Sequence, residues 1–363
     1  AGLVGRVRDW IAPRLEELGF VLSGGGEGGT LPAALPLAPG SPVGVALVRG
    51  DLSIAATGTV TWVDGERIYA FGHPLFGSGR VELPMVAAEV VHTLADQLGS
   101  VRLARTGEEL GAIVDDRLTA IVGRTDERAA LLPVVLEVTG AEAAPHTFRF
   151  EVARRSSLTP VLVGVAVSNA LLSNVAYERE ATMVLHGVLR LVGRAELPLE
   201  LVAAGRDAGH PGFVLGTALQ QLLATLNDNP FGPVELGGLE LQVEARPQVR
   251  RYGVESVRFD RAPLVPGQLL RVDVDLQPYR GPLRRERLEL RVPEHLPRGA
   301  SLSLVVGSPA YLERALGQPV QGRIDSAEDL EALLRALAAR EAGLRLEAAL
   351  VLPSREIVAR GAV

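Results

Sequence analysis

An Asp-Gly pair between two alternating apolar runs is the feature that most constrains how this chain can fold. Asp64-Gly65 separates one such run at 58–63 from another at 67–71. Aspartate and glycine accept the positive φ that tight two-residue turns require. The spacing therefore predicts an antiparallel hairpin whose second strand ends near residue 71.

A histidine follows this hairpin in an unusual setting. Gly72 and Gly77 flank His73-Pro74. Because glycine adopts backbone conformations that other residues avoid, we expect the chain to bend here and to present the imidazole rather than pack it. His73 is therefore the histidine, of six in the chain, that we single out for chemistry.

Composition limits the classes of function. The 363 residues predict two or three domains at about 150 residues each. The formal charge of −6 and the lack of a basic stripe argue against a nucleic-acid partner. All 37 basic residues are arginine and there is no cysteine, which excludes a thiol nucleophile, a disulfide framework and a thiolate metal site. The lack of cysteine fits an extracytoplasmic location and a thermophile equally well. We expect no cofactor.

The chain shows no membrane-spanning run and looks cut from a longer protein. Its most apolar stretch, 161–172, is interrupted by Gly164, Ser168 and Asn169 and is too short to cross a bilayer. The sequence starts at Ala1 without a methionine or a signal peptide, and it stops at Val363 directly after a strand-like run. We therefore expect further sequence beyond both ends.

Four regions follow from hydrophobic periodicity and from Gly/Pro content. Residues 1–42 predict an amphipathic helix and a linker rich in glycine and proline. Residues 43–238 predict short strands, a hairpin at 131–153 and helices at 159–175 and 212–226, while 86–98 fits a helix or a strand.

The last two regions differ from the first two in their pattern of apolar residues. Residues 239–307 hold five alternating runs, starting with 239–243, at intervals typical of an immunoglobulin-like β-sandwich. Residues 308–363 predict a helix at 326–340, with Ser326 as its N-cap, followed by a strand.

Three segments resemble the SpoIVB-type serine peptidase domain, a family of bacterial envelope and sporulation proteins. They are Gly58-Thr59-Val60-Thr61 leading to Ala70-Phe71-Gly72-His73, then Leu110–Asp116 followed by Ala120-Ile121-Val122-Gly123, and the tail 147–363 with Thr159-Pro160. The resemblance implies a periplasmic or secreted location, and either a protein or peptide substrate or an envelope partner. The expected fold is mainly β with α: a partial trypsin-like β-barrel core, an immunoglobulin-like β-sandwich and a small α/β C-terminal segment.

By this resemblance His73 is the general base that takes the proton of a serine nucleophile. The family's serine lies in Gly-Met-Ser-Gly-Ser-Pro, a motif that this chain lacks. Ser41, Ser78 and Ser308 stand near glycine without reproducing it. In long envelope members the serine segment precedes the Gly-His segment, so we expect the nucleophile, and the acid usually beside it, in a missing N-terminal segment of the precursor. Within this chain the candidates to orient His73 are three aspartates, namely Asp64, Asp115 and Asp116.

Other readings of the motifs are less specific. The six histidines include no short-spaced pair such as zinc sites use, so no metal site is predicted. The glycines at 24–29 are followed by Pro32 and Pro36 in a chain without lysine, which favours a linker over a phosphate loop. Two function classes remain open: an incomplete part of a serine endopeptidase, inactive alone, or a non-catalytic envelope binding or assembly module on the same scaffold.

Overall fold

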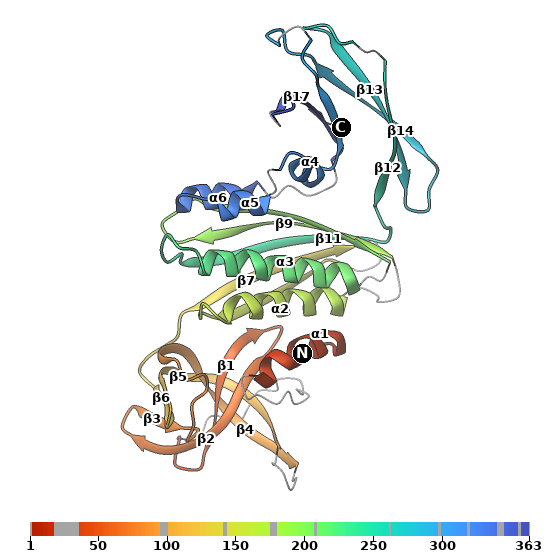
Figure 1. The fold of residues 1–363 in the computed structure, drawn as a ribbon. Helices are drawn as coiled ribbons and strands as arrows, with labels where there is room; N and C mark the ends of the chain where they lie inside the picture. The colour runs from red at the N-terminus through yellow and green to blue at the C-terminus, as the bar shows by residue number, and fades with distance from the viewer. Residues whose placement is uncertain are drawn as a thin grey trace.

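The computed structural model describes residues 2–17, 36–94, 101–140, 144–174, 180–206, 209–260, 263–296, 299–317, 320–339, 345–354 and 357–362. The fold is mainly β with α, as the sequence predicts. Figure 1 shows a barrel at the N-terminal end, a central sheet covered by helices, and two small sheets at the C-terminal end. Most of the linker predicted within residues 1–42 lies outside the described residues.

The first six strands close into an antiparallel β-barrel. They are β1 (Pro42–Gly50), β2 (Ile54–Asp64), β3 (Arg67–Ala70), β4 (Gly79–Leu94), β5 (Val101–Arg117) and β6 (Ala120–Arg124). Their order is β1-β2-β3-β6-β5-β4, and β4 pairs with β1 to close the ring. Since alternate residues of a barrel strand face inward, the interior is filled by side chains such as Val45, Val60, Ile68, Met85 and Ile113.

The predicted hairpin is present as β2–β3. Asp64 pairs with Arg67, so Gly65 and Glu66 form the turn, one residue later than the Asp-Gly pair suggests. Gly65 has a φ of 57°, the left-handed value that makes glycine favourable there. The segment 86–98, which fits either element in the sequence, is strand as far as Leu94, where the described residues stop.

Beyond the barrel the sheet continues in the order β8-β7-β11-β9-β10. These strands are β7 (Leu131–Gly140), β8 (His146–Ala153), β9 (Ala181–Leu191), β10 (Leu197–Gly205) and β11 (Leu236–Arg246). β7 and β8 form the predicted hairpin. β7 and β11 run parallel, while β9 pairs antiparallel with both β10 and β11. β1 joins this central sheet to the barrel, because Val48 pairs with Val152.

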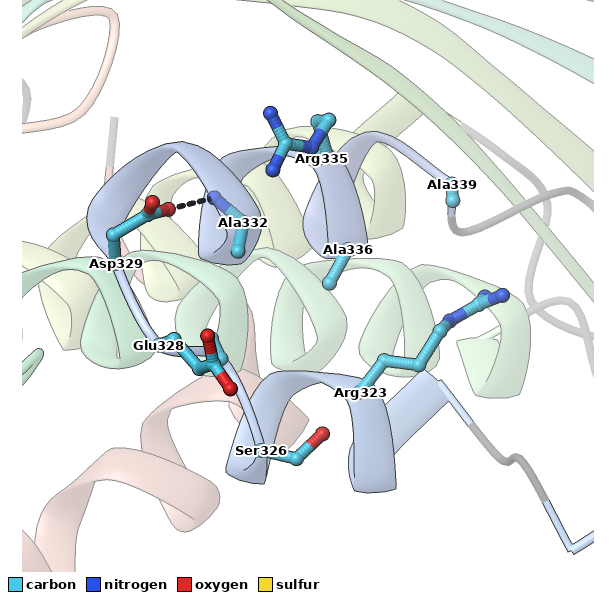
Figure 2. Close-up of a pocket in the computed structure, with 9 residues that line it drawn as sticks. Arg323, Ser326, Glu328, Asp329, Ala332, Arg335, Ala336 and Ala339 are labelled. Carbon is cyan, nitrogen blue, oxygen red and sulfur yellow. Dashed lines mark hydrogen bonds between the residues drawn. The ribbon is translucent and has the colours of Figure 1, made fainter.

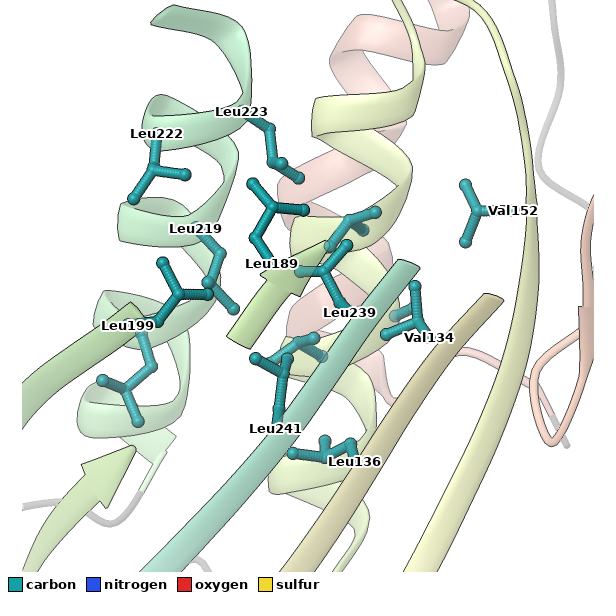
Figure 3. Close-up of a cluster of buried hydrophobic side chains, with 14 of the residues drawn as sticks. Val134, Leu136, Val152, Leu189, Leu199, Leu219, Leu222, Leu223, Leu239 and Leu241 are labelled. Carbon is teal, nitrogen blue, oxygen red and sulfur yellow. The ribbon is translucent and has the colours of Figure 1, made fainter. Parts of the chain in front are cut away.

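Helices cover both faces of the central sheet. α2 (Thr159–Asn174) and α3 (Gly209–Asn227) cover one face, α1 (Gly5–Glu17) packs outside α2, and α5 (Val320–Asp325) and α6 (Leu330–Ala338) lie on the opposite face (Figure 1). Figure 3 shows the leucine-rich core between α3, α2 and the strands, with Leu189, Leu219, Leu223, Leu239 and Leu241 converging. Each such leucine contributes about 1.5–3 kcal/mol through burial.

Residues 239–243 do not belong to the C-terminal sheets, where the sandwich prediction places them. They belong to β11, between β7 and β9 in the central sheet. Leu239, Leu241 and Val243 are buried while Glu240, Gln242 and Glu244 are exposed. This alternation predicts a strand with one buried face, but it carries no information about the distant strand that will pair with it.

Two three-stranded sheets form the C-terminal body. One contains β12 (Tyr252–Phe259), β13 (Leu269–Pro278) and β14 (Arg284–Arg291), and the other contains β15 (Ser303–Gly307), β16 (Glu347–Val351) and β17 (Ile357–Ala362). They share one core that includes Leu270, Val272, Leu290, Ala348 and Leu350. The boundary predicted at 307/308 therefore does not separate two cores, since β16 and β17 complete the sheet of β15.

The helix predicted at 326–340 begins later than expected. α5 ends at Asp325, and α6 begins at Leu330 with Asp329 as its N-cap in place of Ser326. The Asp329 carboxylate accepts a hydrogen bond from the backbone N–H of Ala332 at 2.6 Å (Figure 2). An aspartate that satisfies an N–H group of the first turn is a strong helix start, so it decides the boundary. α4 (Pro309–Ala315) is capped similarly by Ser308.

α2 and α3 pack closely through small residues. A Cβ added at Gly216 would collide with the Ser168 hydroxyl and lie 2.6 Å from the carbonyl oxygen of Gly164. We predict that Gly216→Ala lowers the free energy of unfolding by about 1–3 kcal/mol, because overpacking forces the helices apart. The matched control is Gly5→Ala in α1, where a Cβ would have nothing within 4 Å. Equal urea midpoints for the two variants would contradict the close packing.

Candidate functional site

The segment after β3 holds a cluster of left-handed backbone conformations. φ is 75° at Phe71, 74° at Gly72, 65° at Gly77 and 73° at Gly79. Phe71 is not a glycine, so its backbone is strained, and such strain concentrates at functional sites. The Phe71 ring lies over Gly58 of β2, where a side chain would collide with it. The bend that the glycines predict is therefore confirmed.

His73 is exposed at this bend, as the sequence predicts. Its Nδ1 lies 2.8 Å from the carbonyl oxygen of Pro74. Because a carbonyl oxygen can only accept, Nδ1 carries the proton of this bond, and Nε2 of the neutral ring keeps its lone pair. The Phe71 ring lies beside the imidazole, with centroids 5.7 Å apart. His73 is thus an exposed side chain whose ring is oriented by this hydrogen bond, with Nε2 left as the acceptor nitrogen of the neutral ring.

Asp116 is fully buried and holds the loop that follows His73. Its Oδ1 accepts the N–H of Leu75 at 2.8 Å, and its Oδ2 accepts the N–H groups of Phe76 at 2.7 Å and Ser78 at 3.3 Å. Both oxygens are therefore committed to the backbone, and no hydrogen bond among the described residues joins them to the imidazole. The structure gives Asp116 a positioning role: it fixes the bend from which His73 projects.

The other predicted residues do not converge with His73 through hydrogen bonds. Asp115 pairs with Arg117 at 2.9 Å on the surface of β5, and Asp64 is exposed at the β2–β3 turn. The serines have structural roles: the Ser41 hydroxyl accepts the N–H of Ala38, and the Ser308 hydroxyl caps α4. In the described part of the chain, none of these side chains bonds the imidazole.

Arg155 is a residue of this site that sequence reasoning missed. Its guanidinium lies over the Phe76 ring at 4.4 Å, next to the backbone that Asp116 holds. Burial lowers the pKa of Arg155 below its ordinary value, while the charge of Asp116 opposes that shift. Thr159, at the start of α2, accepts the N–H of Arg155 at 2.7 Å. In the sequence, the helix start at Thr159-Pro160 could have pointed to Arg155, because Arg155 lies just ahead of this helix.

Two cavities lie away from His73, each of about 510 Å³. One lies along α5 and α6, where Figure 2 shows Arg323, Glu328, Asp329 and Arg335 around it. Arg323 pairs with Glu313, and Asp329 caps α6. Two of the charged residues that line this cavity therefore already stabilise the fold. The other lies between the central sheet and the C-terminal body and is lined by four arginines. No group of three or more potential metal ligands occurs within the described ranges.

We predict that Asp116→Ala lowers the free energy of unfolding by about 3 kcal/mol, because each buried N–H group left without an acceptor costs about 1–3 kcal/mol. Amide hydrogen exchange at Leu75 and Phe76 should accelerate. The adjacent Asp115→Ala is the control, and its surface pair should contribute less than about 1 kcal/mol. Equal losses for the two variants, measured by chemical denaturation, would rule out this role of Asp116.

Comparisons with protein-family models, with curated proteins and with solved structures found no match to this chain. The resemblance to SpoIVB-type peptidases therefore stays a hypothesis that rests on residues such as Gly72-His73. Among the described residues, no helix has both the length and the apolar character needed to cross a bilayer.

Proposed function

We propose that this chain is the base-bearing part of a SpoIVB-like serine endopeptidase, with His73 as the general base. The nucleophilic serine would come from a segment outside these residues, since the family's serine motif is absent from the sequence. The single observation that carries the proposal is the exposed His73 side chain on a strained loop, with Nδ1 bonded to the Pro74 carbonyl. On this proposal the chain alone does not cleave peptides.

The chemistry needs an imidazole in a fixed tautomer. A serine hydroxyl is a weak nucleophile until a positioned base removes its proton, and the base is oriented through its other nitrogen. In this chain the Pro74 carbonyl takes that second position. A carbonyl holds the tautomer but gives the imidazolium less stabilisation than a carboxylate would. The missing segment would thus supply the acid as well as the serine.

The architecture supports the same proposal. The closed ring of six antiparallel strands would be the family's partial trypsin-like barrel, and His73 follows shortly after its β3 strand. The two small sheets around one core would be a reduced immunoglobulin-like sandwich. The proposed location is periplasmic or secreted, with a protein or peptide substrate.

One observation favours the second candidate, a non-catalytic envelope binding or assembly module. Both oxygens of Asp116 bind backbone N–H groups, and Asp115 pairs with Arg117. The described residues therefore present a base without a hydrogen-bonded acid or nucleophile. A scaffold that had lost catalysis would look the same, because a fold does not imply an activity.

The test is labelling by a fluorophosphonate, which reacts with activated serines. The protein is expressed together with the residues encoded ahead of Ala1, and we expect the serine there to be labelled. His73→Ala should slow labelling by at least about a hundredfold, the usual contribution of a general base.

The matched control is His92→Ala, which removes another exposed histidine, on β4, and should leave the labelling rate unchanged. Circular dichroism checks that each variant folds. Labelling that persists in His73→Ala removes His73 from the mechanism, and a longer protein that is not labelled at all favours the non-catalytic module.

A further inference from the structure

Four arginines gather where the C-terminal body meets the central sheet. Arg250 and Arg251 precede β12, Arg284 begins β14 and Arg345 lies just before β16. All four are exposed and line the same cavity of about 510 Å³. The chain passes from the central sheet into β12 at this point (Figure 1). Segments far apart in the sequence thus bring their positive charge to one place.

These arginines form no salt bridge among the described residues, whereas several others of the same body do. Arg258 and Arg285 pair with Asp275, Arg287 pairs with Asp273, and Arg360 pairs with Glu347. Among the described residues, no ion pair involves the four arginines of the cavity. Glu286, the single carboxylate in the lining, leaves an excess of positive charge. In a chain of net charge −6, such a local excess marks a place suited to an anionic partner.

The remaining lining is mainly apolar, with Tyr252 and Ser308 as its hydroxyl-bearing residues. Val202 and Ala204 come from the edge strand β10, Val254 and Leu276 from β12 and β13, and Leu346 precedes β16. The planar guanidinium group of arginine binds a carboxylate through two parallel hydrogen bonds. The apolar residues between the arginines suit alkyl side chains. The lining therefore matches a ligand that alternates acidic and apolar groups.

The cavity extends to a free sheet edge, because Tyr252 and Val254 of β12 line it. β12 is an end strand of its sheet, with β13 as its neighbour on one side. Its side chains are exposed along most of the strand, including Tyr252 at 45%, Val254 at 42% and Phe259 at 51%. Val257 and Phe259 pair with Val274 and Val272, which lie in the shared core. An edge strand with unpaired backbone groups and an exposed apolar side is a template for another strand.

We propose that this arginine cavity and β12 together bind an extended acidic peptide of a partner protein. The peptide would add as a strand to the free edge of β12 and place its carboxylates at Arg250, Arg251, Arg284 and Arg345. Strand addition obtains affinity from main-chain hydrogen bonds and specificity from pockets for alternate side chains. The positive charge is confined to one partly apolar cavity, whereas nucleic acid requires an extended basic surface. This surface is separate from His73 and does not depend on the peptidase proposal.

The experiment measures fluorescence anisotropy of a labelled octapeptide that alternates glutamate and valine. We expect saturable binding that weakens as salt rises, since salt screens exposed charges. A peptide with glutamine in place of glutamate should bind at least about tenfold more weakly, because the charged contacts are lost. The same peptide with N-methyl groups on alternate backbone amides should also lose about tenfold, because it cannot form the strand ladder.

Protein variants locate the site. The double variant Arg251→Gln/Arg284→Gln should weaken binding by about tenfold. The control is Arg291→Gln, an exposed arginine at the other end of β14 and outside the cavity lining, which should have no effect. His73→Ala should also leave peptide binding unchanged, which keeps this test independent of the peptidase proposal. Circular dichroism confirms the fold of each variant.

Three outcomes would overturn the proposal. The first is that the glutamine peptide binds as well as the glutamate peptide. The second is that the N-methylated peptide keeps full affinity, which would reduce the site to a simple anion cavity. The third is that inorganic tripolyphosphate or a short DNA duplex displaces the peptide at equal charge concentration, which would show an unselective cationic patch.

Discussion

Strand β1 is the element on which the rest of the structure depends, because it belongs to two cores at once. Val43 and Val45 face the interior of the barrel, whereas Leu47 and Val48 lie in the core of the central sheet. A register shift between Ala46 and Val48 marks the change, and a bulge of this kind redirects side chains along a strand. β1 pairs with β2, β4 and β8. It therefore closes the barrel and also attaches it to the neighbouring sheet.

The candidate site is a consequence of the barrel. Asp116 lies near the end of β5, and the barrel brings that end close to the loop after β3. A carboxylate that accepts several backbone N–H groups inside a protein holds the backbone firmly, since unsatisfied buried groups are unfavourable. The loop can thus keep Phe71 at a positive φ and His73 exposed. The sequence marks Asp116 as a candidate to orient His73, but its role as a loop anchor is a property of the packed barrel.

The ion pairs of the C-terminal body also depend on which strands are neighbours. Arginine is the basic residue everywhere in this chain, and in the C-terminal body many arginines face aspartate or glutamate across neighbouring strands, as Arg285 does Asp275. Such pairs fix register and neutralise charge along an exposed sheet face. Where the body meets the central sheet, Arg280 still pairs with Glu180, but the four arginines that line the cavity form no salt bridge among the described residues, and their positive charge gathers beside an open strand edge. On the proposal above, the cavity arginines serve a partner, whereas the arginines paired across strands serve folding.

The sequence alone determined what depends on neighbours along the chain. The β2–β3 hairpin, the bend at Gly72 and Gly77, and the helices α2 and α3 were predictable, because turn chemistry and periodicity act over a few residues. Tertiary structure alone decided which strands meet: that 239–243 joins the central sheet, that β4 returns to β1, and that Asp116 bonds the loop after His73. Those outcomes depend on pairing between distant segments, and the alternation of apolar and polar residues in one strand is compatible with many partners. Only the packed chain selects among them.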